Sequence, residues 1–180
     1  SRHDNSRRPL PQWNARQLQF SNPMSHYRAS LLFVCLGNIC RSPVAEALCK
    51  TYVHTHNLPV HCDSAGLHGF HSGELPDKRT LKNCQQHGLN MDGLVSRKLK
   101  RDDFYQFDYL IAMDQPVFEK LNTMVNPPEL KNKIKLFRYF ETNTSETCVP
   151  DPYYGTDSDF ELVYQICKRV MPELIQALVK

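Results

Sequence analysis

The sequence lacks the cysteine patterns that mark a zinc ribbon or a secreted disulfide scaffold. Its seven cysteines include no Cys-x-x-Cys pair and follow no regular spacing, so reduced thiols in the cytoplasm are expected. No apolar run approaches the length of a membrane span, and the N-terminal SRHDNSRRPLPQWNARQLQF lacks the apolar centre of a secretory signal. We therefore expect a cytoplasmic protein with no membrane span.

The chain also lacks a strong net charge. The formal charge is +3, and residues 1–30 alone carry +4 through five arginines and one aspartate, which leaves residues 31–180 at −1. A nucleic-acid-binding domain needs a basic face, so no nucleic-acid partner is expected. A chain of 180 residues with 41% hydrophobic content suits one domain. We expect a disordered or additional leader over residues 1–28 and one domain over 29–180.

Apolar runs alternate with segments of helical periodicity after the leader, which is typical of an α/β fold with a mostly parallel sheet. The run LLFVC at 31–35 is wholly apolar, as a central strand covered on both faces would be. Ser42 is expected to cap the following helix, with Pro43 in its first turn. Further strands are expected at 59–63, 108–113 and 134–137, and further helices at 76–87, 116–124 and 159–180, the last kinked or restarted at Pro172.

The segment LFVCLGNICRSP places a cysteine at the end of the first strand and Ser-Pro where a helix begins. A helix N-terminus presents unpaired amide N–H groups and the positive end of the helix dipole, which together bind anions. The amides of residues 36–42 therefore form the wall of a predicted oxyanion-binding cup. The same field favours the thiolate form of Cys35, which is the nucleophilic form.

Arg41 follows Cys35 by six positions, and its planar guanidinium can bind two phosphate oxygens. Gly37 and Asn38 tolerate the left-handed conformation that turns the amides inward. Ser42 can donate a hydrogen bond to the sulfur. A buried core cysteine beside a surface arginine is the alternative reading, but these residue types together at a strand end favour the cup.

Phosphoryl transfer through cysteine also needs a proton donor for the departing oxygen and later a base for water. The motif DPYYG supplies Asp151 in a proline-flanked turn, followed by Tyr153 and Tyr154 as an aromatic wall for a ring-bearing substrate. Such a motif alone could be a simple turn. Beside the cysteine and the arginine it predicts a general acid.

The motifs VCLGNICRSPVAEA, DSAG, PDKR, QHG, FDYLIAMD and DPYYG occur in this order. From about Leu31 to Lys180 the chain thereby resembles the low-molecular-weight protein tyrosine phosphatases. The resemblance implies a three-layer fold, in which a four-stranded parallel sheet of order 2-1-3-4 has helices on both faces and a phosphate-binding loop after strand 1. It also implies hydrolysis of phosphotyrosine, and of small aryl phosphates or acylphosphates, without cofactor or metal.

The same resemblance implies roles for individual residues. Cys35 would form a phosphocysteine intermediate, Arg41 would bind phosphate, and Asp151 would act as general acid and then as base. The implied phosphate-binding loop consists of Leu36, Gly37, Asn38, Ile39, Cys40, Arg41 and Ser42. A supporting hydrogen-bond network would contain Asn38, Ser42, Asp63, Ser64 and His87, with Asp63 orienting His87. The implied substrate walls are Ile39, Phe70, Tyr153 and Tyr154.

Cys40 lies in the loop five residues after Cys35. In relatives with this second cysteine a reversible disulfide protects the nucleophile from further oxidation, so the resemblance implies redox control. The implied partners are phosphotyrosine-containing proteins, with inorganic phosphate or similar oxyanions in the site. The protein would be a monomer or would self-associate weakly through its tyrosine-lined rim.

Four other readings stay open. An arsenate reductase of the same fold would need two further cysteines after the third strand, where YLIAMDQPVFEKL has none. A protein arginine phosphatase carries Thr where this chain has Ile39, whose bulk should crowd a guanidinium. A non-catalytic phosphate-binding module would retain the cup without chemistry. A zinc site at His54, His56 and Cys62 is weaker, because no closed set of four ligands is present.

Overall fold

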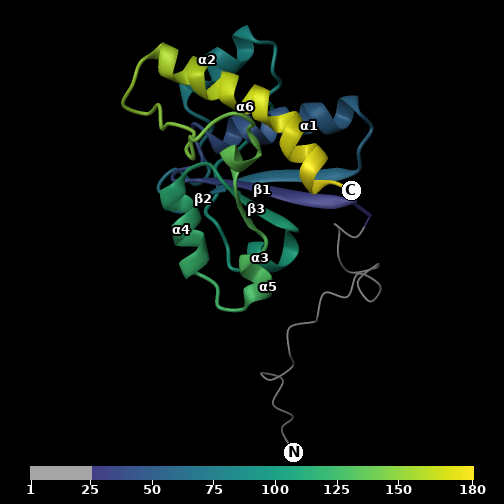
Figure 1. Cartoon of the computed structure of the whole chain (residues 1–180). Coiled ribbons are helices and arrows are strands. Elements are labelled where there is room, and N and C mark those ends of the chain that lie inside the picture. The colour runs from purple at the N-terminus through teal and green to yellow at the C-terminus, as the bar shows by residue number, and fades with distance from the viewer. Residues whose placement is uncertain (1–25) are drawn as a thin grey trace, which may run out of the picture.

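The computed structural model describes residues 26–180, and its centre is a four-stranded parallel sheet (Figure 1). The strand order is β2-β1-β3-β4, and each pair of neighbours runs in parallel register. The predicted fold and strand order are therefore confirmed. The strands are β1 (Ala29–Cys35), β2 (Val60–Gly66), β3 (Tyr109–Ala112) and β4 (Ile134–Leu136).

Helices cover both faces of the sheet, as Figure 1 shows. One face carries α1 (Ser42–Thr55), α2 (Lys78–Gln86) and the long α6 (Asp157–Leu178). The other carries α3 (Asp103–Gln106), α4 (Gln115–Thr123) and α5 (Pro128–Lys131), and the 3₁₀ turn η2 (Phe137–Phe140) follows β4. Parallel strands need such crossover connections, and these bury the sheet on both sides.

The apolar run of β1 divides between the two cores. Leu31 and Phe33 pack in the cluster with α1 and α6, whereas Leu32 and Val34 pack in the cluster with α4 and α5. Successive side chains of a strand point to opposite faces, so a wholly apolar strand is what a central position requires. This anchoring fixes the end of β1, and with it Cys35.

The observed boundaries differ from the expected ones in places that matter for the site. The N-cap of α1 is Arg41, which makes no side-chain cap hydrogen bond, and Ser42 is the first helical residue. Ser42 is therefore not the cap, because its hydroxyl turns toward the sulfur of Cys35. Pro172 lies inside an uninterrupted α6. The short α5 and η2 were not expected.

The leader expected over residues 1–28 falls mostly on residues 1–25, which lie outside the described residues. From residue 26 onward, no helix combines the length and the apolar character that crossing a membrane requires.

Candidate active site

The loop after β1 surrounds the sulfur of Cys35 at the carboxyl end of the sheet, the edge at which open α/β sheets bind ligands. A cavity of about 250 Å³ opens over this loop. Cys35 and Arg41 line it together with Asp151, which arrives from a segment more than one hundred residues later in the chain. The complete lining is Cys35, Leu36, Gly37, Ile39, Cys40, Arg41, His68, Phe70, His71, Asp151, Tyr153 and Tyr154.

Asn38 shapes the loop with both its backbone and its side chain. Its φ of 60° is left-handed, a conformation that asparagine tolerates. The side-chain Nδ2 donates to Ser42 Oγ at 2.8 Å and to Ser64 Oγ at 2.9 Å, and Oδ1 accepts from the Arg97 N–H at 3.0 Å. Both amide hydrogens and the oxygen are thus used, which fixes the orientation of this buried side chain.

Two donors reach the sulfur of Cys35. The Asn38 N–H donates to Sγ at 3.3 Å, and Ser42 Oγ lies 3.0 Å from Sγ. Because Ser42 Oγ already accepts from Asn38, its own hydrogen is free to point at the sulfur. The arrangement stabilises a negative charge on the thiolate and, equally, on a thiolate leaving group.

Arg41 is held from the far side of the loop. Its Nη1 donates to Asp114 Oδ2 at 2.5 Å and to the Val149 carbonyl at 3.1 Å, and Nη2 lies 3.7 Å from Asp151 Oδ2. Burial alone would lower the pKa of Arg41, but the charge of Cys35 and the contact with Asp114 hold it above its usual value. The guanidinium is therefore charged and oriented before any substrate arrives.

The predicted walls differ in exposure. Phe70 and Tyr154 are 84% and 96% exposed, whereas Tyr153 is 38% exposed and lies under the guanidinium of Arg79 at 5.6 Å. The Tyr153 N–H donates to Asp151 Oδ1 at 3.1 Å, which orients the carboxylate at the mouth. Ile39 is almost fully buried and packs with Cys40 and Phe160, so only part of it faces the cavity.

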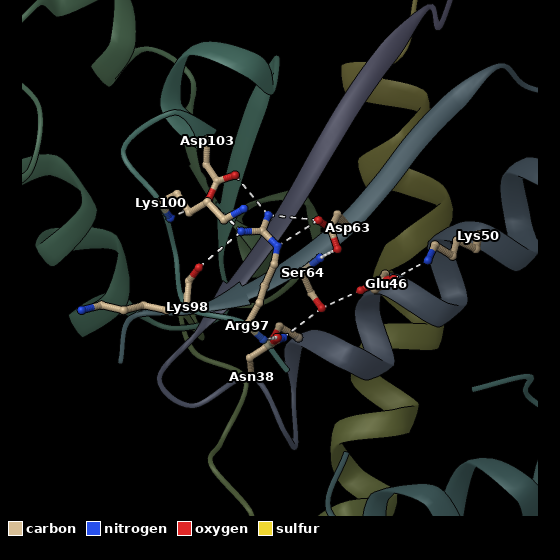
Figure 2. A network of polar contacts seen from close by, with 10 residues as sticks. Asn38, Glu46, Lys50, Asp63, Ser64, Arg97, Lys98, Lys100 and Asp103 are labelled. Atoms are coloured by element: carbon tan, nitrogen blue, oxygen red, sulfur yellow. Dashed lines mark hydrogen bonds and ion pairs between the residues drawn. The ribbon is translucent and has the colours of Figure 1, made fainter. Parts of the chain in front are cut away.

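Behind the loop lies a relay of polar groups, drawn in Figure 2. Ser64 Oγ donates to Glu46 Oε1 at 2.6 Å, and Lys50 donates to the other carboxylate oxygen of Glu46. Burial raises the pKa of Glu46, and the hydrogen bonds from Lys50 and Ser64 oppose this effect. Since the Ser64 hydroxyl donates to Glu46, its oxygen is left to accept from the side-chain Nδ2 of Asn38.

Arg97 is the second support in Figure 2, and it joins segments that flank the loop. Its guanidinium lies 3.0 Å from Asp63 Oδ2 and 3.0 Å from Asp103 Oδ2. Its backbone N–H holds Asn38 Oδ1. Asp63 therefore forms its ion pair with Arg97, and this corrects the expectation that Asp63 orients His87.

His87 is not part of the network under the loop, so that prediction was wrong. His87 Nε2 lies 2.5 Å from Glu161 Oε1, and the imidazole stacks on Tyr164 at 3.7 Å. His87 is the C-cap residue that follows α2, and its side chain connects the end of that helix to α6. The side chain thus lies at the C-terminal end of a helix, the position that a histidine before a helix-ending glycine usually takes.

Three contributors were missed at the level of sequence: Glu46, Arg97 and Asp114. Asp114 closes the motif FDYLIAMD after β3, so an acid at the end of a strand next to β1 was a usable signal. Glu46 is a lone acid among apolar residues in VAEALC, which also marks a buried partner. Arg97 stands in a segment without any comparable pattern.

Four of the remaining thiols are packing residues of the core, whereas Cys148 is only partly buried. Cys49, Cys62, Cys84 and Cys167 are buried in the core on the α1 and α6 face. Burial, together with the nearby charges of Asp77 and Cys35, raises the pKa of Cys40 to about 12.

Within residues 26–180 no three His, Cys, Asp or Glu side chains are placed to hold a metal ion, so His54, His56 and Cys62 do not form a site.

The comparisons with known proteins agree with this geometry. The family model of the low molecular weight phosphotyrosine protein phosphatases matches residues 30–180. The protein of that name from Pongo abelii is 43% identical over 143 residues, covering 78% of this chain and 89% of the relative.

Solved structures give the same result. A protein tyrosine phosphatase from Entamoeba histolytica has a TM-score of 0.78 and 41% identity, covering 83% of this chain and 96% of that one. The drosophila arginine phosphatase DARP has a TM-score of 0.76 and 33% identity, covering 82% and 96%. The chain, with its cysteine loop at the end of β1, belongs to the low molecular weight phosphotyrosine protein phosphatase family.

Proposed function

We propose that this protein hydrolyses phosphotyrosine through a phosphocysteine intermediate on Cys35. The observation that carries the proposal is the convergence on one cavity of three groups: a sulfur with two donors, a guanidinium and a carboxylate. These are the nucleophile, the oxyanion binder and the acid that phosphoryl transfer requires. Family membership supports the same reaction.

In the first step the Cys35 thiolate attacks phosphorus, so an S–P bond forms while the P–O bond to the phenol breaks. Asp151 gives its proton to the departing oxygen. Arg41 and the loop amides bind the three equatorial oxygens, on which negative charge accumulates. Because Asp114 fixes the guanidinium before binding, little reorganisation is needed in the transition state.

In the second step water attacks the phosphocysteine. Asp151, now ionised, takes the proton from water, the S–P bond breaks, and inorganic phosphate leaves. The departing thiolate receives the hydrogen bonds from Ser42 and the Asn38 amide. The same two donors therefore assist both steps.

Redox control belongs to this proposal. Peroxide would oxidise the Cys35 thiolate to a sulfenic acid, and attack by Cys40 would form a disulfide and release water. Burial raises the pKa of Cys40 to about 12, so Cys40 remains a thiol at neutral pH and is not the sulfur that peroxide oxidises first. A cytoplasmic location fits the unpaired state of all seven cysteines. Weak self-association through the exposed Tyr154 completes the proposal.

The test is hydrolysis of phosphotyrosine, phosphoserine and phosphoarginine peptides by reduced protein in the presence of a chelator. We expect fast turnover of phosphotyrosine, abolished by Cys35→Ser and strongly reduced by Asp151→Ala. Cys148→Ser is the matched control, because this partly buried thiol lies outside the cavity. Preferred hydrolysis of phosphoarginine would assign the chain to the other activity seen among its structural neighbours. No turnover by reduced parent protein would overturn the enzymatic proposal.

A further inference from the structure

Two histidines that the proposed chemistry does not use lie at the mouth of the cavity. His68 and His71 come from the loop after β2, and both line the cavity. Their rings cover Gly37: a Cβ built on this glycine would lie 3.1 Å from His68 Cε1 and 3.3 Å from His71 Cδ2. The two imidazoles therefore rest directly on the phosphate-binding loop, within its electrostatic field.

The contacts of His68 fix which of its nitrogens carries a proton. Nδ1 accepts a hydrogen bond from the Phe70 N–H at 3.3 Å, so the proton of the neutral ring must sit on Nε2. Nε2 has no hydrogen-bond partner among residues 26–180. His68 thus offers an N–H donor at the mouth in its neutral form as well as in its cationic form.

His71 is oriented by a carboxylate. Its Nδ1 lies 2.7 Å from Glu74 Oε2, and Nδ1 must be the donor because a carboxylate only accepts. The imidazole side chain remains 29% exposed, so its other edge is open to solvent and ligand. On protonation Nε2 becomes a second N–H donor beside that of His68, whose ring centroid is 6.0 Å away.

The carboxylates around the mouth already have cationic or imidazole partners. Glu74 is bound by His71, and Asp77 forms an ion pair with Arg79 at 3.0 Å. Asp151 lies near Arg41. An incoming anion therefore meets the Nε2–H of His68, joined by that of His71 once this ring is protonated, and no unpartnered carboxylate beside them.

We propose that His68 and His71 form an accessory anion subsite that favours phosphotyrosine flanked by an anionic side chain. This inference rests on the proposed phosphotyrosine activity and adds the class of substrate. The anion is a carboxylate of Asp or Glu or a second phosphate, which share the need for N–H donors. Neighbouring residues of an extended peptide lie about 3.8 Å apart at Cα, so a flanking side chain reaches the rim while the phosphotyrosine fills the cup.

The experiment compares kcat/KM for peptides that differ only beside the phosphotyrosine, with Asp, phosphoserine or Asn on either side. We expect the parent to favour the Asp or phosphoserine peptide over the Asn peptide by about fivefold, the order expected of a partly exposed charged hydrogen bond. The preference should shrink in high salt. The double variant His68→Ala, His71→Ala, which removes both sets of N–H donors, should bring the ratio close to one.

The ratio is the readout because both histidines line the binding cavity and their replacement can also change the absolute rate. His54→Ala, at the exposed end of α1, is the matched control and should keep the parental ratio. Equal hydrolysis of all peptides, or a preference that survives the double variant, would overturn the subsite and leave the phosphotyrosine activity standing. Failure to hydrolyse any phosphotyrosine peptide would instead overturn the proposed function.

Discussion

Asp114 holds Arg41 with one carboxylate oxygen and caps α4 with the other. Oδ2 accepts from Arg41 Nη1 at 2.5 Å, and Oδ1 accepts from the Val117 N–H at 2.8 Å. Asp114 thus connects the Arg41 guanidinium at the cavity to the first turn of α4, on the face of the sheet opposite α1. A neutral amide cannot replace it, because its NH₂ group would face either the guanidinium or the helix N–H groups.

Asp114→Asn should therefore lower kcat/KM for phosphotyrosine by about tenfold and weaken competitive inhibition by inorganic phosphate, since a misoriented Arg41 binds oxyanions poorly. Steady-state kinetics with phosphate as inhibitor measure both effects. Asp102→Asn, an exposed acid whose side chain makes no helix cap, is the control. An Asp114→Asn variant with parental phosphate inhibition would contradict the orienting role.

Ser64→Ala should lower the free energy of unfolding by about 1–3 kcal/mol, because one buried N–H of Asn38 loses its acceptor. Glu46→Gln should be milder, since the amide oxygen still accepts from Ser64 and no charge is buried. Urea unfolding of both variants and of Ser145→Ala, an exposed serine, gives the comparison. If Ser64→Ala unfolds at the same urea concentration as Ser145→Ala, the relay does not support the loop.

Cys40→Ser should make inactivation by peroxide progressively irreversible, because the sulfenic acid on Cys35 then has no neighbouring thiol and oxidises further. The measurement is activity recovered by dithiothreitol after timed peroxide exposure. Cys84→Ser controls for the loss of a buried thiol in the core. Recovery of the Cys40→Ser variant as complete as that of the parent would rule out the protective disulfide.

The contact between α2 and α6 should weaken in acid. Hydrogen bonds from Gln165 and then from His87 lower the pKa of Glu161 to about 2. A carboxyl whose pKa is lower in the folded state stabilises the protein above its unfolded value, and this stability is lost as pH falls from about 4.5 toward 2. The free energy of unfolding of the parent should exceed that of Glu161→Gln near pH 6.

That difference should shrink steadily between about pH 5 and pH 3. Denaturant unfolding of the two proteins at each pH measures this difference in the free energy of unfolding. Ionisable groups that both proteins share cancel in the difference. The effect is small, since the Glu161 side chain is 39% exposed and water screens it. A difference independent of pH over this range would show that the ionised carboxylate contributes nothing.

Local sequence signals predicted the parts of this site that lie on one segment. The run LLFVC and the residues from Gly37 to Ser42 specify a strand, a tight loop and a helix start by propensity and periodicity alone. The motif DPYYG already predicted Asp151 as an acid of the same site. The strand order came from the family resemblance, because pairing between distant segments leaves no local pattern.

The errors also have physical causes. His87 was placed under the loop by its motif, but the chain turns at Gly88, where φ is 68°, and leaves the side chain against α6. Arg97 supports the loop with a backbone N–H, which every residue type except proline carries, so no side-chain pattern could predict it. The short α5 and η2 are single turns, too brief to show periodicity.

The phosphocysteine on Cys35 is the central claim, and trapping it is the most direct test. Asp151→Ala is mixed with p-nitrophenyl phosphate, whose leaving group needs little protonation, so that the intermediate forms but lacks the base for its hydrolysis. After acid quenching, mass spectrometry of peptides should find phosphate on Cys35, and Cys35→Ser should show none. Turnover with phosphate on another residue, or with no covalent phosphate at all, would contradict the mechanism.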